Sequence, residues 1–328
     1  MSQKMSSTPK ISIIVPVYNA GTRLEKCLYT LINQTLTDIE IILVLDCPTD
    51  GSDKLAKEYA KQDERIVIVE NEKNLHIGES RNRGLSVAKG EYIGFSDHDD
   101  YRELTMYEEL YNKTKLNNAD IVMSFLENKN EIKSRFADFG ENIFTKEFLL
   151  KDLIGFGYSN HQGALFVQVN NNLYRNDLIK QNQIVFVDTN FITPEDVLFQ
   201  IKSIYFASKI DFVRKQFYYH VKHLHNEGSK YSYVSYKKRS AGIAEIYNFL
   251  QSKNIFESYK NDFMKGVTKQ FINSLSGTLY PIPNLIKFRK AVKHLRSYPF
   301  CKEAFESYSL PPVKHNLFRR FLVERLRQ

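Results

Sequence analysis

The chain has 328 residues, of which 42% are hydrophobic and 26% charged, a composition typical of soluble globular proteins. No apolar run is long enough to cross a bilayer, and the polar segment 1–10 lacks the apolar core of a signal peptide. The three cysteines, Cys27, Cys47 and Cys301, do not have the spacing of metal ligands, which indicates reduced thiols in a cytoplasmic protein.

The positive charge is concentrated near the C-terminus. Residues 287–328 contain 11 Lys or Arg against 3 Glu, so the rest of the chain holds 35 of the 46 basic and 35 of the 38 acidic residues. A neutral body argues against a nucleic-acid-binding protein and indicates a local basic appendage.

Residues 11–125 alternate between two periodicities. Short β-rich runs are followed by segments with apolar residues on one helical face, a pattern typical of βαβ units on a mostly parallel sheet. The expected strands are 11–15, 39–45, 65–69, 91–95 and 120–124. Polar residues follow the first four strands. Because ligands bind beyond the carboxyl ends of such strands, we expect these segments to line one crevice.

Three carboxylates in four residues follow the fourth expected strand, at Asp97, Asp99 and Asp100. Carboxylates this close repel one another and resist desolvation. A divalent cation bridging to a diphosphate would make the arrangement favourable, since Mg²⁺ and Mn²⁺ are shared between carboxylates and phosphates. A solvated acidic turn before a helix near Glu103 is the alternative, because Asp is a common N-cap.

The second half of the chain is less regular. We expect a helix at 144–153, strands at 164–169 and 184–187, and a helix that Thr193 caps with Pro194 at its first position. Beyond residue 236 the pattern is helical, at 244–250 and 263–275, with a break at 280–284.

Several motifs, in this order, resemble a family 2 glycosyltransferase with the GT-A fold. The resemblance covers about residues 10–230 and is carried by ISIIVPVYN (11–19), LD (45–46) with TDGS (49–52), Asn74, RNRGL (81–85), GEYIGFSDHDD (90–100), NNLYR (171–175) and PEDVLF (194–199). It implies an α/β fold, with a Rossmann-like, mostly parallel sheet flanked by helices and a helical C-terminal region. It also implies inverting transfer of a sugar from a nucleotide sugar to an acceptor hydroxyl.

The resemblance implies that the nucleotide lies at the first strand ends. The residues that it assigns to nucleotide binding are Pro16, Tyr18, Asp46, Asn74, Arg81 and Asp97. Asp46 would accept the N3–H of uracil, which favours a UDP-sugar, although a turn-forming Asp is the alternative. The family pattern usually has Asp-Asp-Gly-Ser here, whereas this chain has Leu45-Asp46-Cys47-Pro48. Arg81 could neutralise the diphosphate or form a structural ion pair with Asp97.

The resemblance also implies a cofactor, Mn²⁺ or Mg²⁺, bound by Asp99 with Asp97 and by His225 as a further ligand. Asp100 would bind the cation or orient its neighbours. His98 replaces a residue that is usually small and is expected to point away. His220 and His223 are expected to be aromatic-packing or exposed loop residues. The 220/223/225 spacing could also resemble a zinc site, but neither a helical period nor a cysteine supports one.

Asp196 is the expected general base. An acceptor hydroxyl has a pKa far above neutrality, so a positioned carboxylate helps by taking its proton as the bond forms. One carboxylate is enough, because the cation stabilises the leaving diphosphate without a protonated acid. Glu195 would contact the acceptor. The alternative is that Glu195 and Asp196 are acids that favour a helix N-terminus.

Two rival functions stay open. The Gly-Thr-Arg-Leu sequence at 21–24 resembles that of sugar-nucleotide pyrophosphorylases, which are nucleotidyltransferases, but their glycine-rich loop is replaced by Tyr18-Asn19-Ala20. The basic pI of about 9.1 would suit a non-enzymatic nucleotide-binding module, but the neutral body argues against it.

We expect three regions: a nucleotide-sugar-binding half at 1–125, an acceptor-side half with the catalytic base at 126–235, and a helical, basic region at 236–328. Within the last, residues 317–327 form a basic amphipathic pattern that suits an anionic membrane surface or docking on the protein itself. A lipid-linked saccharide acceptor, as in bacterial surface-polysaccharide synthesis, would suit a cytoplasmic enzyme peripheral to the inner face of the membrane.

Overall fold

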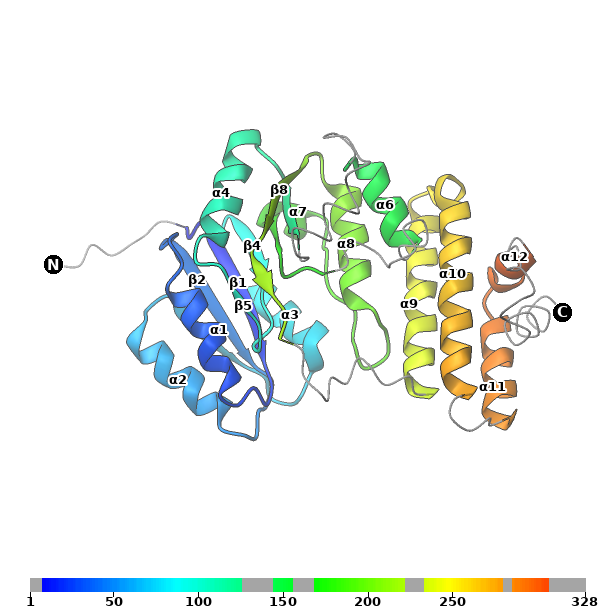
Figure 1. Ribbon diagram of the computed structural model, residues 1–328, viewed down its shortest axis with the longest axis horizontal. Helices are drawn as coiled ribbons and strands as arrows, with labels where there is room; N and C mark the ends of the chain where they lie inside the picture. The colour runs from blue at the N-terminus through cyan, green and yellow to red at the C-terminus, as the bar shows by residue number, and fades with distance from the viewer. Residues whose placement is uncertain (1–7, 126–143, 156–167, 222–232, 280–284, 307–328) are drawn as a thin grey trace. The chain divides into compact units, whose positions relative to one another are not determined.

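The computed structural model describes residues 8–125, 144–155, 168–221, 233–279 and 285–306. They belong to two compact units (Figure 1). The first unit comprises Met1–Lys146, Gln168–Asp188 and Lys202–Lys222, and the second comprises Glu147–Val167, Thr189–Ile201 and His223–Gln328.

A seven-stranded sheet with the order β3-β2-β1-β4-β7-β6-β8 forms the centre of the first unit. β7 is antiparallel to both of its neighbours, and the other pairs are parallel. The sheet is therefore mostly parallel, as the sequence predicts. Its strands are β1 (Ile11–Val17), β2 (Ile39–Leu45), β3 (Ile66–Glu70), β4 (Tyr92–Phe95), β6 (Ile121–Phe125), β7 (Asn172–Arg175) and β8 (Ile210–Gln216).

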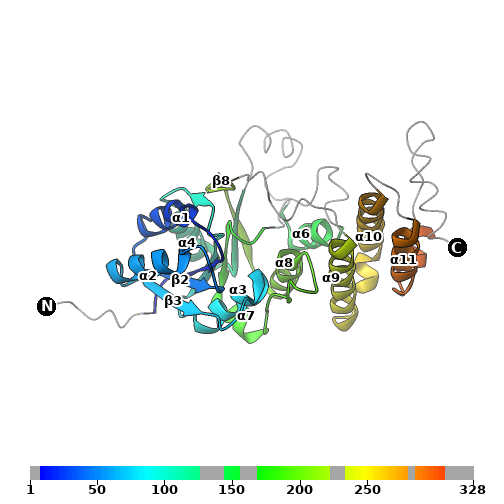
Figure 2. The same ribbon diagram turned by 90° about the horizontal axis from the view of Figure 1, so that it is seen from below.

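Helices cover both faces of this sheet because alternate side chains of each strand point to opposite sides. Ile11, Ile13 and Val15 pack in the main core with residues of α1, α2 and α4. On the other face, a Cβ atom at Gly84 of α3 would lie 2.4 Å from Ile14, so a glycine is needed for this close approach. Figure 2 shows α1 and α4 on one side of the sheet and α3 and α7 on the other. These helices are α1 (Arg23–Ile32), α2 (Ser52–Gln62), α3 (His76–Val87), α4 (Met106–Asn117) and α7 (Asn176–Gln181).

A small antiparallel ribbon lies beside the main sheet. It consists of β5 (Tyr101–Arg102) and β9 (Tyr218–Tyr219), in which Tyr101 pairs with Tyr219 and Arg102 with Tyr218. The ribbon brings the chain after β8 next to the residues that follow β4, more than 100 positions earlier in the sequence.

The second unit is helical. α10 packs against α9, α11 and α12, around a cluster of aromatic rings that includes Tyr247, Phe263 and Phe300. α8 begins in this unit and ends in the first. The helices of the second unit, with α8 included, are α6 (Lys146–Ile154), α8 (Glu195–Phe206), α9 (Tyr233–Ser252), α10 (Phe256–Leu279), α11 (Leu285–Arg296) and α12 (Cys301–Glu306). Among the helices that the structure describes, none has the length and apolar character needed to span a membrane.

Most of the expected elements are confirmed, including the five strands between residues 11 and 125 and the helices near residues 146, 195, 244 and 263. The strand expected at Ile184–Val187 is wrong. Phe186 N–H donates to Asn82 Oδ1 at 2.9 Å, so a side-chain contact takes the place of a strand ladder. α8 begins at Glu195, one residue after Pro194. The break at 280–284, residues 164–167 of the other expected strand and the basic segment 317–327 lie outside the described residues. The three expected regions stay a prediction.

Candidate active site

The carboxyl ends of β1 to β4 meet at one edge of the sheet. Val17 is in register with Leu45, and Leu45 with Glu70, while β4 ends level with Ile14. The loops beyond these ends are joined to one another. Asn19 Oδ1 accepts from Thr49 N–H at 2.8 Å, Gly21 N–H donates to Asp50 Oδ2 at 2.7 Å, and His98 Nδ1 lies 3.0 Å from the Pro16 carbonyl. The expected grouping of polar strand ends is therefore present, and His98 is engaged with β1.

The end of β2 holds a buried carboxylate. Asp46 is 3% exposed, and its Oδ1 accepts from Asn71 Nδ2 at 2.8 Å and from Leu75 N–H at 2.7 Å. Cys47 has a φ of 54°, so this residue takes up the left-handed backbone for which the family pattern uses glycine. Tyr18 is 45% exposed beside this edge. Asn74 Oδ1 accepts from His76 N–H at 3.0 Å, in the turn that leads into α3.

Arg81 links α3 to the acidic turn after β4. Its buried guanidinium lies 6.0 Å from the Phe95 ring centroid and 5.1 Å from that of Phe186. Arg81 Nη2 pairs with Asp97 Oδ1 at 3.2 Å, and the other carboxylate oxygen of Asp97 accepts from Asn170 Nδ2 at 2.8 Å. The predicted Arg81–Asp97 contact is therefore present. The ion pair with Arg81 and the hydrogen bond from Asn170 together orient the Asp97 carboxylate.

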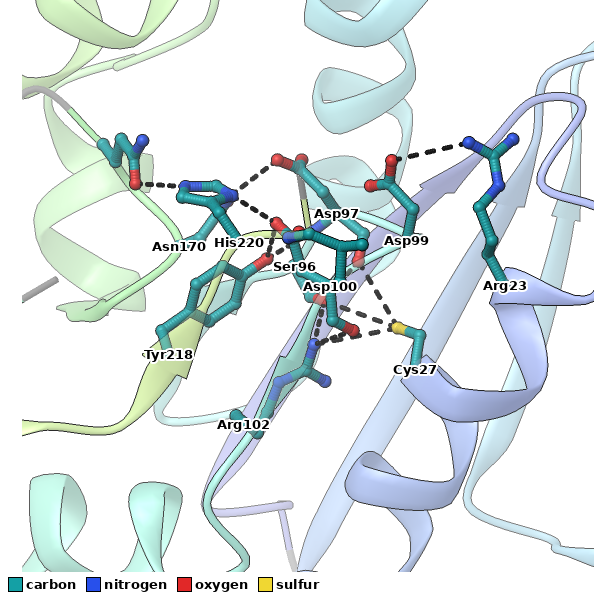
Figure 3. Close-up of polar contacts among 12 residues, drawn as sticks. Arg23, Cys27, Ser96, Asp97, Asp99, Asp100, Arg102, Asn170, Tyr218 and His220 are labelled. Carbon is teal, nitrogen blue, oxygen red and sulfur yellow. Dashed lines mark hydrogen bonds and ion pairs between the residues drawn. The ribbon is translucent and has the colours of Figure 1, made fainter. Parts of the chain in front are cut away.

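Three groups contact the Asp100 carboxylate (Figure 3). The Tyr218 hydroxyl donates to it at 2.9 Å and Val221 N–H at 3.0 Å, and His220 Nδ1 lies 2.7 Å from Asp100 Oδ2. Burial alone would raise the pKa of Asp100, but the contacts with His220, Val221 and Tyr218 hold that pKa below its ordinary value. Burial also opposes the charged form of His220, yet Asp100, with the charges of Asp97 and Asp99, raises the His220 pKa.

This group fits a divalent cation. One ligand atom each from Asp97, Asp100 and His220 lie within 4.8 Å of one another. Gln168 Oε1 contacts His220 Nε2, and because an amide oxygen only accepts, Nε2 carries the hydrogen. In its neutral form His220 therefore presents Nδ1, an acceptor, to the carboxylates. Two carboxylates and an imidazole suit Mn²⁺ well and Mg²⁺ through their oxygens.

Comparison with known proteins identifies the family of this chain. The sequence profile of glycosyl transferase family 2 matches residues 12–174. A cholesterol galactosyltransferase of Borreliella burgdorferi is 34% identical over 263 residues, which cover 78% of this chain and 72% of that protein. The chain belongs to glycosyl transferase family 2.

Two further comparisons place this glycosyltransferase among similar proteins. A poly(ribitol-phosphate) beta-glucosyltransferase of Bacillus spizizenii is 30% identical over 261 residues, 78% of this chain and 39% of that protein. The crystal structure of Staphylococcus aureus TarS residues 1–349 in complex with UDP-GlcNAc aligns with a TM-score of 0.68 at 21% identity, over 90% of this chain and 83% of that chain. The TarS likeness supports the GT-A fold.

The acidic turn of this glycosyltransferase differs in detail from the expected ligand set. Asp99 Oδ2 lies 3.8 Å from Arg23 Nη1, and Figure 3 shows its carboxylate directed toward that arginine. Asp99 as a metal ligand stays a prediction, and His225 lies outside the described residues. His220, expected to be a packing or loop residue, contacts Asp100. The contact follows from the pairing of β9 with β5, which the spacing of the histidines in the sequence does not predict.

The proposed base of the glycosyltransferase lies in the second unit. Glu195 and Asp196 form the first turn of α8. α9 holds the preceding segment, since Thr193 N–H donates to the Lys238 carbonyl at 3.1 Å and Lys238 Nζ to the Thr189 carbonyl at 2.8 Å. α9 therefore helps to hold the segment that leads into the first turn of α8.

Proposed function

We propose that this glycosyltransferase moves a sugar from a UDP-sugar to an acceptor hydroxyl with inversion at the anomeric carbon. The observation that carries the proposal is the convergence of Asp97, Asp100 and His220 at the end of β4. Two strands away in the sheet, the buried Asp46 supplies a carboxylate suited to an imide N–H. The binding of UDP-GlcNAc by TarS, a protein of similar fold, supports a uridine nucleotide.

A divalent cation, Mn²⁺ or Mg²⁺, would be held by Asp97, Asp100 and His220, with Asp99 and His225 as the further ligands that the family resemblance implies. When bound, such a cation stabilises the negative charge that develops on a leaving diphosphate. Arg81 and Asn170 keep Asp97 aimed at this site. Tyr18, Asn74 and the backbone at Pro16 would complete the nucleotide contacts along the same edge.

Asp196 acts as the general base in this proposal. It takes the proton of the acceptor hydroxyl as the new glycosidic bond forms, and Glu195 contacts the acceptor. Because the nucleoside diphosphate leaves without protonation, the reaction needs one carboxylate rather than the two that glycosidases use. Both acids lie in the first turn of α8, where the helix dipole favours the ionised forms.

The acceptor that we propose is a saccharide or a lipid-linked saccharide of a bacterial surface polysaccharide. The names of two relatives support a lipid or polymer acceptor, since one is a cholesterol galactosyltransferase and the other a poly(ribitol-phosphate) beta-glucosyltransferase. Such acceptors would place this enzyme in the cytoplasm, peripheral to the inner face of the membrane.

The described part of the basic region supports membrane attachment. In α11, Ala291, Val292 and Leu295 are buried, whereas Arg289, Lys290 and Lys293 are exposed. The helix contains no acidic residue. A stripe of cations facing away from a packed apolar face suits anionic headgroups, at about 1 kcal/mol for each Lys or Arg near the surface.

Vesicle co-sedimentation tests this attachment. The full chain should sediment with vesicles that contain phosphatidylglycerol, and changing Arg289, Lys290 and Lys293 to Gln should weaken binding several-fold. The matched control changes three exposed lysines of the first unit, Lys54, Lys61 and Lys73, to Gln. Equal loss in both triple variants would show a non-specific charge effect and refute the role of α11.

A nucleotide-sugar panel tests the proposed reaction. With Mn²⁺ or Mg²⁺ present, the enzyme should release nucleoside diphosphate from a UDP-sugar when an acceptor is supplied, and EDTA should abolish the release. Asp99→Asn should lose cation-dependent donor binding. The pyrophosphorylase alternative predicts instead a UDP-sugar from UTP and a sugar 1-phosphate, and that product would overturn the proposal.

A further inference from the structure

The buried tyrosine of β9 has a position that the proposed chemistry does not yet explain. We propose that Tyr218 is a positioning residue, whose hydroxyl fixes Asp97 relative to Asp100 so that the acidic turn is ready to receive a cation. This inference rests on the proposed function, because it concerns the same cation site.

The Tyr218 hydroxyl makes two contacts at once. It accepts from the Asp97 backbone N–H at 3.0 Å and donates to Asp100 Oδ2 at 2.9 Å. A hydroxyl has one hydrogen and two lone pairs, so both bonds form without competition. Tyr218 is fully buried, and water therefore does not replace either bond. One oxygen atom thus connects the first and last aspartates of the turn.

The ring that carries this hydroxyl is itself held in place. In the β5–β9 ribbon Tyr218 pairs with Arg102, whose guanidinium carbon lies 5.4 Å from the Tyr218 ring centroid. Arg102 is buried, and its Nη2 donates to Ser96 Oγ at 2.6 Å and lies 3.4 Å from the Asp100 carbonyl. Figure 3 shows Arg102 and Tyr218 approaching the turn together. The ribbon therefore contacts the turn through side chains from both of its strands.

The histidine directly follows the same strand. Residues two apart in an extended chain point to the same side, so His220 follows Tyr218 toward the carboxylates. Their rings contact edge to face, with centroids 5.3 Å apart and an interplanar angle of 75°. A shift of β9 would therefore move a cation ligand and the hydroxyl that orients the carboxylates by the same amount.

This arrangement has an energetic consequence for cation binding. Carboxylates brought within 4.8 Å of a third ligand repel one another before a cation arrives, and a free Asp100 would turn away. The Tyr218 hydroxyl offsets that tendency in the cation-free protein. Ligands already in place bind more tightly, because less ordering is required on binding.

Tyr218→Phe tests the inference because it removes one oxygen and keeps the ring. The matched control is Tyr107→Phe, since Tyr107 is also fully buried and its hydroxyl has no hydrogen-bond partner among the described residues. Mn²⁺ binding to the full-length protein is measured by titration calorimetry and by the electron paramagnetic resonance signal of free Mn²⁺, with and without UDP.

We expect Tyr218→Phe to weaken Mn²⁺ binding by roughly tenfold or more, the usual effect of losing a group that orients metal ligands. Tyr107→Phe should bind Mn²⁺ within about twofold of the wild-type protein. Arg102→Lys gives a second test if Tyr218→Phe does not fold, because lysine keeps the charge but lacks the planar guanidinium that lies over the Tyr218 ring. It should also weaken Mn²⁺ binding.

Wild-type Mn²⁺ affinity in both the Tyr218 and Arg102 variants would overturn the inference and leave the glycosyltransferase proposal intact. A wild-type protein that binds no Mn²⁺ or Mg²⁺ even with UDP would overturn the cation site itself, and this inference with it. Thermal unfolding of each variant without cation separates a loss of affinity from a loss of fold.

Discussion

The acids at the end of β4 and those at the start of α8 are held in different ways. The carboxylates of Asp97 and Asp100 receive hydrogen bonds or ion pairs from residues between 16 and 121 positions away in the sequence. Glu195 and Asp196 belong to the first turn of one helix, and the segment before them is hydrogen-bonded to α9. The first pair belongs to a turn after a strand of the first unit, and the second to a helix start in the second unit.

We infer that the two regions serve different parts of the reaction. A cation and a diphosphate carry concentrated charge, so their site needs rigid, pre-oriented ligands. The rigid strand ends of a buried sheet and the ribbon beside it supply them. An acceptor contributes a neutral hydroxyl, and a carboxylate at a helix start can take its proton. Four variants test how separate the two regions are.

Asp196→Asn should have the largest effect. Loss of a general base typically costs 10²- to 10⁴-fold in rate, so sugar transfer should fall by about that factor. UDP and cation affinity should stay unchanged, because the nucleotide residues lie in the first unit. Transfer kinetics and UDP titration measure the two properties. A parallel loss of UDP binding would show that the two regions are not separable, and transfer at the wild-type rate would exclude Asp196 as the base.

Gly242→Ala should come next. A Cβ atom at Gly242 of α9 would lie 2.2 Å from the Thr193 carbonyl oxygen, so the segment before α8 must shift. Since displacing a catalytic group by about 1 Å can lower the reaction rate roughly 10²-fold, the rate of sugar transfer should fall strongly while UDP still binds. Gln251→Ala, at an exposed position of α9, is the control and should behave like the wild type. Unchanged transfer by the Gly242 variant would show that α9 does not determine the position of Asp196.

Asp46→Asn should have a smaller effect, on nucleotide selection. A hydrogen bond to a charged acceptor contributes about 1.5–3 kcal/mol, so preference for UDP over GDP should fall by roughly tenfold or more. Competition binding with the two nucleotides measures the preference. Asp50→Asn is the control, because Asp50 bonds to Ser52 and Gly21 within the neighbouring loops. Equal selectivity in the Asp46 variant and the wild type would remove Asp46 from base recognition.

Thr268→Val should have the smallest effect, confined to stability. The buried Thr268 hydroxyl lies 2.9 Å from the Met264 carbonyl of its own helix and 2.9 Å from the Ala304 carbonyl of α12. Its loss should lower the free energy of unfolding by about 1 kcal/mol, measured by urea denaturation. Thr114→Val, whose hydroxyl donates to the Tyr111 carbonyl of its own helix, should cost less. Equal losses would mean that the link to α12 contributes nothing.

The sequence alone determines the sheet and most of the helices of this protein. The strands near residues 11, 39 and 92 are predicted because a short run of apolar residues is itself the signal of a buried strand. The acidic turn and the helix start at Glu195 are also visible, since clustered carboxylates and a Pro-Glu-Asp sequence have local physical meaning.

Only the tertiary structure decides which groups meet the acidic turn. Tyr218 and His220 reach it because β9 pairs with β5, and Asn170 reaches it because β7 lies beside β4. These contacts depend on strand order and register, which join residues more than 70 positions apart. Local propensity contains no information about such pairings. A histidine expected to pack on aromatic rings or to lie in an exposed loop therefore packs on Tyr218 and also contacts the carboxylates.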